Sequence, residues 1–98
     1  MKNKVKKIGI ALVGCGEIGI VNALAIKGSE NSSLKAVMDI DINLANDIGK
    51  RMRVPAYADL DKMLSMDEID AVFISTPPDS RKNIIKKAAK KRKHIIVE

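Results

Sequence analysis

Three glycines form the strongest chemical motif in this chain. They stand at positions 14, 16 and 19, after the apolar run from Ile8 to Val13 and before a segment whose apolar residues recur at helical spacing. This pattern of strand, turn and helix start suits a dinucleotide. Gly14 permits the turn, Gly16 lets the backbone approach a pyrophosphate, and Gly19 lets the helix pack closely on the strand. The phosphates would lie at the helix N-terminus, where unpaired N–H groups favour an anion.

A carboxylate gives the glycine motif its context. The motif alone is weak evidence, since glycine-rich turns also occur in ordinary strand-to-helix loops and in S-adenosylmethionine sites. The next apolar run, Leu34 to Met38, ends in Asp39, which lies 20 positions after Gly19. Dinucleotide folds place at this distance the acid that hydrogen-bonds the adenosine ribose. Glycines and acid together favour nucleotide binding over a purely structural turn.

Alternating strands and helices would position these residues. The predicted strands cover residues 7–13, 34–38, 54–57, 69–74 and 94–97, and the predicted helices cover 17–27, 42–52, 60–64 and a basic segment beginning at Asp79 or Ser80. This alternation implies right-handed crossovers and a parallel sheet. We therefore expect an α/β, Rossmann-type three-layer domain with strand order 3-2-1-4-5. The glycine loop, Asp39 and loop 75–78 should meet outside the carboxyl ends of the strands.

Helical periodicity also predicts which side chains are buried. Asp41 and Asp59 have the right type and place to cap the second and third helices. The last strand, which begins at His94, is expected to be buried, and its histidine to be structural. The buried stripe of the first helix is predicted to be Ile18, Val21, Leu24 and Ala25.

Size and charge limit the classes of protein to consider. The 98 residues allow one domain, 1–98, and the formal net charge is +6. Basic clusters can bind nucleic acid through phosphate contacts. One Phe and one Tyr, with no Trp, leave no aromatic side chains between the charges to stack bases. Nucleic-acid binding is therefore disfavoured, and the lysines are interpreted as a solvated face. One basic cluster lies at the N-terminus and consists of Lys2, Lys4, Lys6 and Lys7. The other is the last helix, whose predicted apolar face consists of Ile84, Ile85, Ala88 and Ala89.

Cys15 is the sole cysteine, which excludes an internal disulfide and gives no support for a metal or CxxC site. It is interpreted as a small turn residue and not as a nucleophile, and we predict no metal site. The apolar stretch before Gly14 is too short for a signal peptide or a membrane span. The single cysteine favours a reducing compartment, so a cytoplasmic protein that does not enter membranes is expected.

Further segments resemble a known family. Residues 13–19, 36–39, 54–60, 69–78 and 94–98 are similar, in order and spacing, to the N-terminal nucleotide-binding domain of the Gfo/Idh/MocA oxidoreductases. The resemblance implies NAD or NADP binding, with hydride transfer at a sugar, polyol or related carbinol. It covers nearly the whole chain and is far more specific than the glycine motif alone.

The resemblance also implies roles for individual residues. The backbone around Gly16, Glu17 and Ile18 would hold the pyrophosphate, beside Gly14 and Gly19, and Asp39 would bind the adenosine ribose. Ser75, Thr76 and Pro77 would line the central and nicotinamide portion of the cofactor, and Glu98 would lie near the nicotinamide ribose. Ile40 follows Asp39 where a phosphate partner could stand, so NAD is favoured over NADP. Three basic residues could still reach a 2′-phosphate: Lys35, Lys50 and Arg51.

At two positions where members of the family frequently carry histidine, this sequence has Asn22 and Arg81. Asn22 is expected to point to solvent. Arg81 is interpreted as a surface charge, and the alternative is a cation near the cofactor phosphates, which a guanidinium suits.

The resemblance also bears on catalysis. The family motif continues Glu-Lys-Pro, whereas this sequence stops at Glu98 and lacks the second domain. We therefore predict no catalytic residue here, and expect a fragment that binds a dinucleotide without catalysing alone. The alternative is a stand-alone, non-catalytic binding or assembly module that pairs with itself, or with a missing C-terminal domain, through an exposed last strand.

Overall fold

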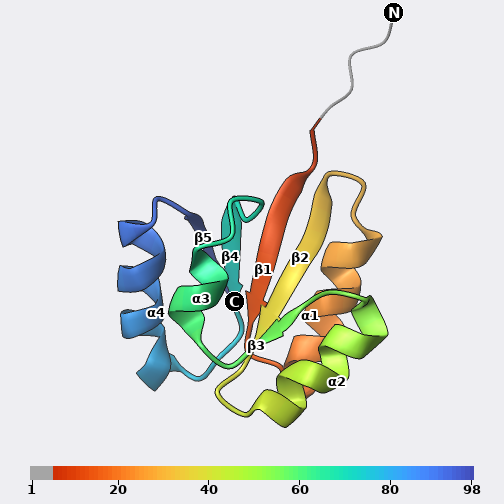
Figure 1. Cartoon of the computed structure of the whole chain (residues 1–98), viewed down its shortest axis with the longest axis horizontal. Coiled ribbons are helices and arrows are strands. Elements are labelled where there is room, and N and C mark those ends of the chain that lie inside the picture. Colours follow the sequence, from red (N-terminus) through yellow and green to blue (C-terminus); the bar gives the residue numbers. More distant parts are fainter. Residues whose placement is uncertain (1–5) are drawn as a thin grey trace, which may run out of the picture.

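Five strands and four helices alternate along residues 6–98, the part of the chain that the computed structural model describes (Figure 1). Their bounds match the predicted ranges to within two residues at each end. Lys2 and Lys4 of the basic N-terminus lie outside the described residues. The elements are β1 Ile8–Val13, α1 Glu17–Gly28, β2 Ser32–Met38, α2 Ile42–Met52, β3 Ala56–Tyr57, α3 Leu60–Leu64, β4 Ala71–Ile74, α4 Pro78–Lys90 and β5 His94–Val97.

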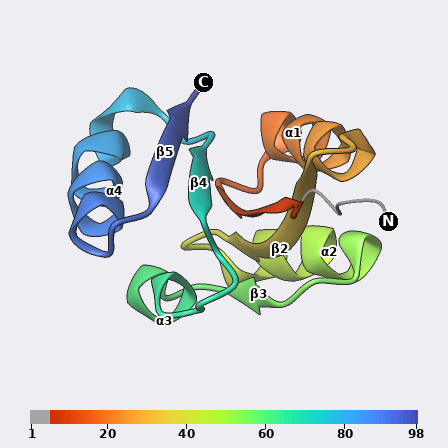
Figure 2. The same cartoon turned by 90° about the horizontal axis from the view of Figure 1, so that it is seen from above.

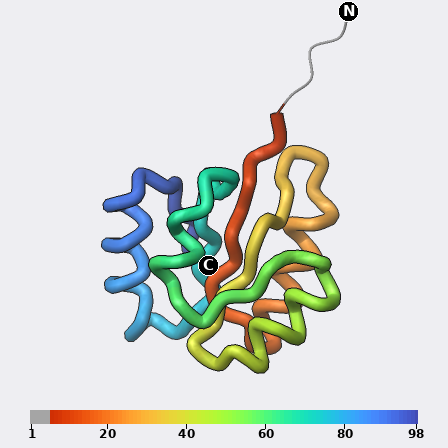
Figure 3. The backbone as a smooth tube through the Cα atoms, in the orientation of Figure 1, coloured from red at the N-terminus to blue at the C-terminus, as the bar shows by residue number. Residues whose placement is uncertain are grey.

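The strands form one parallel sheet in the order β3-β2-β1-β4-β5, which confirms the prediction. Figure 2 shows α1 and α2 on one side of the sheet and α3 and α4 on the other. Because helices cover both faces, the central strands are apolar at successive positions, and Leu12 and Val72 are wholly buried. The loops that follow β1, β2 and β4 gather at one end of the sheet, as parallel strands require (Figure 3). Within residues 6–98, no helix is long and apolar enough to cross a membrane.

The orientation of α1 differs from the prediction. Ile18, Val21 and Leu24 are 56%, 59% and 56% exposed, and Ala25 is also exposed. The buried face consists of Gly19, Asn22, Ala23 and Ile26. The physical reason is a backbone contact: a Cβ on Gly19 would lie only 2.3 Å from the carbonyl oxygen of Gly14. This close approach fixes the rotation of the helix and places its small residues against the sheet, so the larger apolar residues face outward.

The last strand also differs from the prediction of a buried strand. Among the strands of residues 6–98, β5 lies at the edge of the sheet and has a single strand neighbour. Its His94 is exposed, and Ile96 and Val97 are 41% and 42% exposed. The preceding helix, α4, buries Ile84 and Ala88 as expected, whereas Ala89 is exposed.

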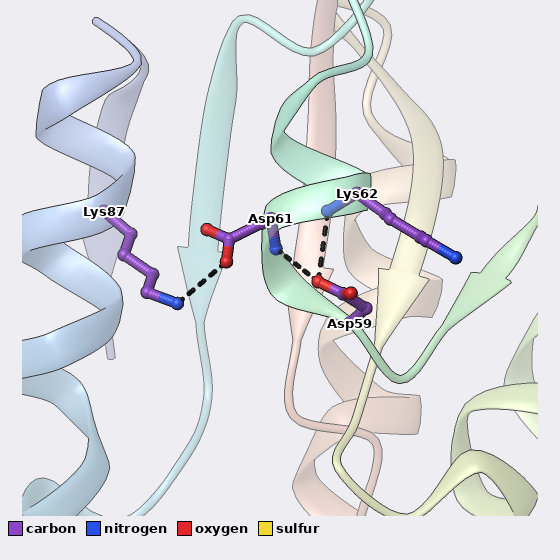
Figure 4. A network of polar contacts seen from close by, with 4 residues as sticks. All are labelled: Asp59, Asp61, Lys62 and Lys87. Carbon is purple, nitrogen blue, oxygen red and sulfur yellow. Dashed lines mark hydrogen bonds and ion pairs between the residues drawn. The ribbon is translucent and has the colours of Figure 1, made fainter.

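Aspartates cap two of the helices, as predicted. The Asp41 Oδ1 atom accepts a hydrogen bond of 3.0 Å from the N–H of Asn43 at the start of α2. At the start of α3, Asp59 Oδ1 accepts from the N–H groups of Asp61 and Lys62, at 2.9 and 3.2 Å (Figure 4). These carboxylates satisfy N–H groups that have no partner within the helix.

We expect Asp59→Ala to lower the free energy of unfolding by about 1 kcal/mol, because the cap of α3 is lost. The matched control is Asp61→Asn, which weakens the 3.0 Å ion pair to Lys87 and leaves the cap in place. That pair joins side chains that are 63% and 39% exposed, so its loss should change stability by less than about 0.5 kcal/mol. Thermal unfolding followed by circular dichroism measures both, and equal losses would contradict the assignment of the cap.

Candidate functional site

The turn after β1 depends on glycine at position 14. Gly14 has a φ of +108°, and a Cβ there would lie 2.8 Å from the carbonyl oxygen of Ser75. Its N–H donates to the carbonyl of Met38 at 2.8 Å, and the N–H of Ser75 donates to the carbonyl of Val13 at 2.8 Å. The turn is therefore held between the ends of β2 and β4, in a conformation that L side chains rarely adopt.

The N-terminus of α1 is open. Gly16 is its N-cap, and within the described chain no side chain caps the first N–H groups. Gly16, Glu17 and Ile18 are exposed. Apart from neighbouring residues, no atom of residues 6–98 lies within 4 Å of the point that a Cβ of Gly16 would occupy. An anion can therefore approach these N–H groups, which the partial positive charge of the helix end favours.

The carboxylate of Asp39 stands beside the glycine turn. Its Oδ2 accepts from the N–H of Cys15 at 2.8 Å, and its Oδ1 accepts from the N–H of Asp41 at 2.9 Å. The side chain is half-buried. Each carboxylate oxygen can accept more than one hydrogen bond, so Asp39 holds the loop and retains acceptor capacity for a ligand hydroxyl.

A hollow of about 660 Å³ opens next to Asp39. Its lining includes Gly14, Asp39, Ile40, Thr76 and Pro77, from the loops after β1, β2 and β4. These are the segments that the sequence predicted to meet. The remaining predicted residues lie elsewhere along the same edge: Gly16, Glu17 and Ile18 at the start of α1, Gly19 inside it, and Ser75, Arg81 and Glu98 beyond β1 on the side of β4 and β5.

The prediction for Asn22 was wrong. This residue was expected to point to solvent, but it is only 8% exposed. Its Nδ2 donates to Ser75 Oγ at 2.9 Å and to Glu98 Oε1 at 3.1 Å, and Ser75 Oγ lies 3.4 Å from the same Glu98 oxygen. The correct signal was its spacing, because Asn22 follows Gly19 by three positions and so shares the face that packs on the sheet.

The model of the Gfo/Idh/MocA family, described as an oxidoreductase family with an NAD-binding Rossmann fold, matches residues 8–98. The chain belongs to this family.

Relatives of this Gfo/Idh/MocA chain include enzymes and solved structures. It is 32% identical to an inositol 2-dehydrogenase of Rhizobium meliloti, over 93% of this chain and 27% of that protein. The structure of scyllo-inositol dehydrogenase from Lactobacillus casei, with bound NAD(H) and scyllo-inositol, matches with 29% identity and a TM-score of 0.86, over 94% and 28% of the two chains. A protein of Desulfitobacterium hafniense described as an NADPH-dependent oxidoreductase matches with 26% identity and a TM-score of 0.91, over 96% and 27%. The chain thus spans about a quarter of the length of these relatives.

Arg81 of the Gfo/Idh/MocA chain folds back onto the loop after β4. Its Nε donates to the carbonyl of Thr76 at 3.0 Å, and the side chain is half-buried. Arg81 does not line the 660 Å³ hollow. This geometry braces the loop and differs from a freely solvated surface charge.

The basic residues that could have reached a 2′-phosphate lie away from Asp39. Lys35 lines a separate hollow with Lys6, Lys7 and Gly9, near the opposite end of β1. Arg51 lies 3.7 Å from Asp47 on α2, and Lys50 lines a small hollow beside β3. Of the residues that line the hollow next to Asp39, Lys87 alone is cationic, and it pairs with Asp61 (Figure 4).

Cys15 lies within the glycine turn and is buried. Its thiol donates to the carbonyl of Met38 at 3.4 Å. Burial, with the negative charge of Asp39, raises the pKa of the thiol from 9.0 to about 12. The reactive thiolate is therefore scarce at neutral pH, which agrees with a turn residue and disfavours a nucleophile.

We expect the folded chain to react with iodoacetamide at pH 8 at least tenfold more slowly than the chain unfolded in urea. A raised pKa keeps Cys15 protonated in the native state, and unfolding removes both causes of the shift. Mass spectrometry of quenched samples measures the rates. The folded rate should rise as pH increases from about 9 toward 12; equal rates at pH 8 would contradict this account.

Proposed function

We propose that this chain is the cofactor-binding part of an NAD-dependent oxidoreductase that acts on an inositol or a related polyol or sugar. One observation carries the proposal: the open N-terminus of α1, the carboxylate of Asp39 and the 660 Å³ hollow adjoin one another at one edge of the sheet. The relatives named as inositol dehydrogenases support the substrate class.

The residues at this edge fit the chemical groups of a dinucleotide. The N–H groups of the first turn of α1 would bind the pyrophosphate, and the absent side chain of Gly16 leaves room for it. Asp39 would accept hydrogen bonds from the adenosine ribose. Ile40 lines the hollow and is 89% exposed, so an adenine ring in the hollow would cover it. Thr76 and Pro77 would form the opposite wall.

The remaining residues of the site would serve the rest of the cofactor. When bound, the nicotinamide ring supplies the hydride acceptor or donor. Ser75 and Glu98 would bind its ribose, and Arg81 would keep the loop at Thr76 in place. Proton transfer from the alcohol needs a group within hydrogen-bond distance of it. We assign that group to the part of the relatives that this chain does not cover, and no catalytic residue to the chain itself.

NAD is the proposed cofactor, with NADP less favoured. The carboxylate of Asp39 repels a 2′-phosphate, and Ile40 offers it no positive charge. Lys87, the cation at the hollow, is already paired with Asp61. The basic residues considered from the sequence line other surfaces.

A fluorescence titration with NADH tests the proposal. We expect a saturable change in NADH emission with the 98-residue chain, and no NADH formation when NAD and myo-inositol are supplied together. Absence of saturable binding at millimolar NADH would refute the binding function. Measurable turnover would refute the claim that the catalytic group lies elsewhere.

A second candidate is an assembly module, favoured by the exposed apolar face of α1 and the exposed edge strand β5. Ile18, Val21 and Leu24 on α1, together with Ile96 and Val97 near the edge, are all at least 41% exposed. Such surfaces are typical of contacts with another chain or domain. Sedimentation analysis distinguishes the candidates, because self-association without NADH binding would favour assembly. The cytoplasmic location predicted from the single cysteine stays a proposal for either function.

A further inference from the structure

Asn22 joins three segments that are far apart in sequence. It lies on α1, and its amide contacts Ser75 after β4, 53 residues away, and Glu98 after β5, 76 residues away. Within the described part of the chain, Asn22 is the one polar residue that is buried. A buried amide is unfavourable unless its hydrogen bonds are made. Here both of its N–H donors have acceptors, so the site is built around this side chain.

The two groups that accept hydrogen bonds from Asn22 indicate a role beyond packing. An alanine or leucine would fill an interior position on α1 without any polar requirement. The amide instead donates at 3.1 Å to Oε1 of Glu98, a residue that is otherwise exposed, and at 2.9 Å to Ser75 Oγ. The hydroxyl of Ser75 lies 3.4 Å from the same Glu98 oxygen. These contacts hold the carboxylate through one oxygen and leave the other, Oε2, with acceptor capacity.

The position of this network along the sheet indicates what it serves. Asp39 follows β2, the glycine turn follows β1, Ser75 follows β4 and Glu98 follows β5, and these strands are neighbours in the order β2-β1-β4-β5. A dinucleotide with its first ribose at Asp39 and its phosphates at α1 would therefore extend its second nucleoside toward Ser75 and Glu98.

We propose that Asn22 is a positioning residue for the nicotinamide half of the cofactor, acting by orienting the Glu98 carboxylate and the Ser75 hydroxyl toward the second ribose. This inference rests on the proposed function. It predicts that Asn22 contributes to binding of whole NADH and contributes little to binding of the adenosine half.

The experiment compares the dissociation constants of NADH and ADP, since ADP carries only the adenosine and pyrophosphate. In Asn22→Leu, which has the same branching and no donors, we expect NADH affinity to fall about tenfold and ADP affinity to change less than twofold. Asn22→Asp has the same shape but places a carboxylate against Glu98, so it should bind NADH more weakly still. The control is Asn46→Leu, an exposed position on α2, which should change neither constant.

A double-mutant cycle with Glu98→Ala shows whether Asn22 acts through Glu98. Asn22→Leu should change the ratio of the NADH to the ADP dissociation constant less in the Glu98→Ala background than in the unmodified chain, because only its contact with Ser75 is then left to lose. If Asn22→Leu fails to fold by circular dichroism, Asn22→Ser, whose hydroxyl is too short to reach both acceptors, is used in its place.

The outcomes separate this inference from the proposed function. Binding of neither ligand by the unmodified chain would refute the proposed function. If the unmodified chain binds NADH but the Asn22 variants bind NADH and ADP equally weakly relative to it, Asn22 is a purely structural residue. That result would overturn the inference and leave the proposed function standing. Unchanged NADH binding in Asn22→Asp, or independent effects in the cycle, would also overturn it.

Discussion

A Gly16→Ala variant is expected to remain folded, losing no more than about 1 kcal/mol because alanine is a poorer N-cap than glycine, and to bind NADH about 30-fold more weakly. Gly16 has a φ of −76°, which alanine adopts without strain, and apart from its neighbours no atom of the described chain would meet the new methyl group within 4 Å. The same open space is where the pyrophosphate would contact the backbone. Overpacking at a close contact costs about 2 kcal/mol, which corresponds to roughly 30-fold in affinity.

The measurements are an NADH titration and a thermal melt on the same samples. Gly28→Ala is the matched control. Apart from neighbouring segments, no atom of residues 6–98 lies within 4 Å of the point that its Cβ would occupy, and Gly28 lies at the far end of α1 from the proposed phosphate site. It should leave affinity unchanged and should not lower stability, because alanine favours a helix more than glycine does. NADH binding by Gly16→Ala at the unmodified affinity would place the phosphates elsewhere.

Asp39→Ala should weaken NADH binding by about 30-fold and NADPH binding much less. Hydrogen bonds to a charged group contribute roughly 1.5–3 kcal/mol, and NADH would lose those that its adenosine ribose makes with the carboxylate. NADPH would also lose the repulsion between that carboxylate and its 2′-phosphate. The ratio of the NADPH to the NADH dissociation constant should therefore fall toward one, as measured by parallel titrations.

Asp39 has a second role that this experiment must separate. Its Oδ2 holds the N–H of Cys15 at 2.8 Å, so alanine also removes a contact within the glycine turn. Asp39→Asn keeps an acceptor for the turn and loses the charge, so it should show the change in the cofactor ratio with a smaller loss of stability. Asp47→Ala, exposed on α2, serves as the control. A ratio that stays the same in both Asp39 variants would count against the ribose assignment.

Local sequence patterns were sufficient for most of the fold. Apolar runs bounded by turns predicted the five strands, and the caps at Asp41 and Asp59 predicted where two helices begin. The strand order was expected from the dinucleotide-binding fold that the glycine turn and Asp39 indicate, and the right-handed crossovers then decide which face of the sheet each helix covers. The meeting of Gly14, Asp39 and Thr76 beside one hollow followed in turn from that order.

The faces of α1 and β5 could not be predicted in the same way. Periodicity shows that a helix has an apolar side, but it does not show that this side faces the sheet. In α1 the backbone contact between Gly19 and Gly14 decides the rotation, and it leaves Ile18 and Val21 outside. The apolar composition of β5 indicated burial, whereas its place at the sheet edge exposes it.

The sequence by itself determined the family, the parallel sheet and the glycine turn with its acid, because those depend on residue types at short and regular spacing. Tertiary structure alone decided that the Asn22 amide joins Ser75 to Glu98. Its partners lie 53 and 76 residues away, and no local periodicity encodes a hydrogen bond across that distance. The amide meets them only when β4 and β5 have paired beside β1 and the glycine contact has set the rotation of α1.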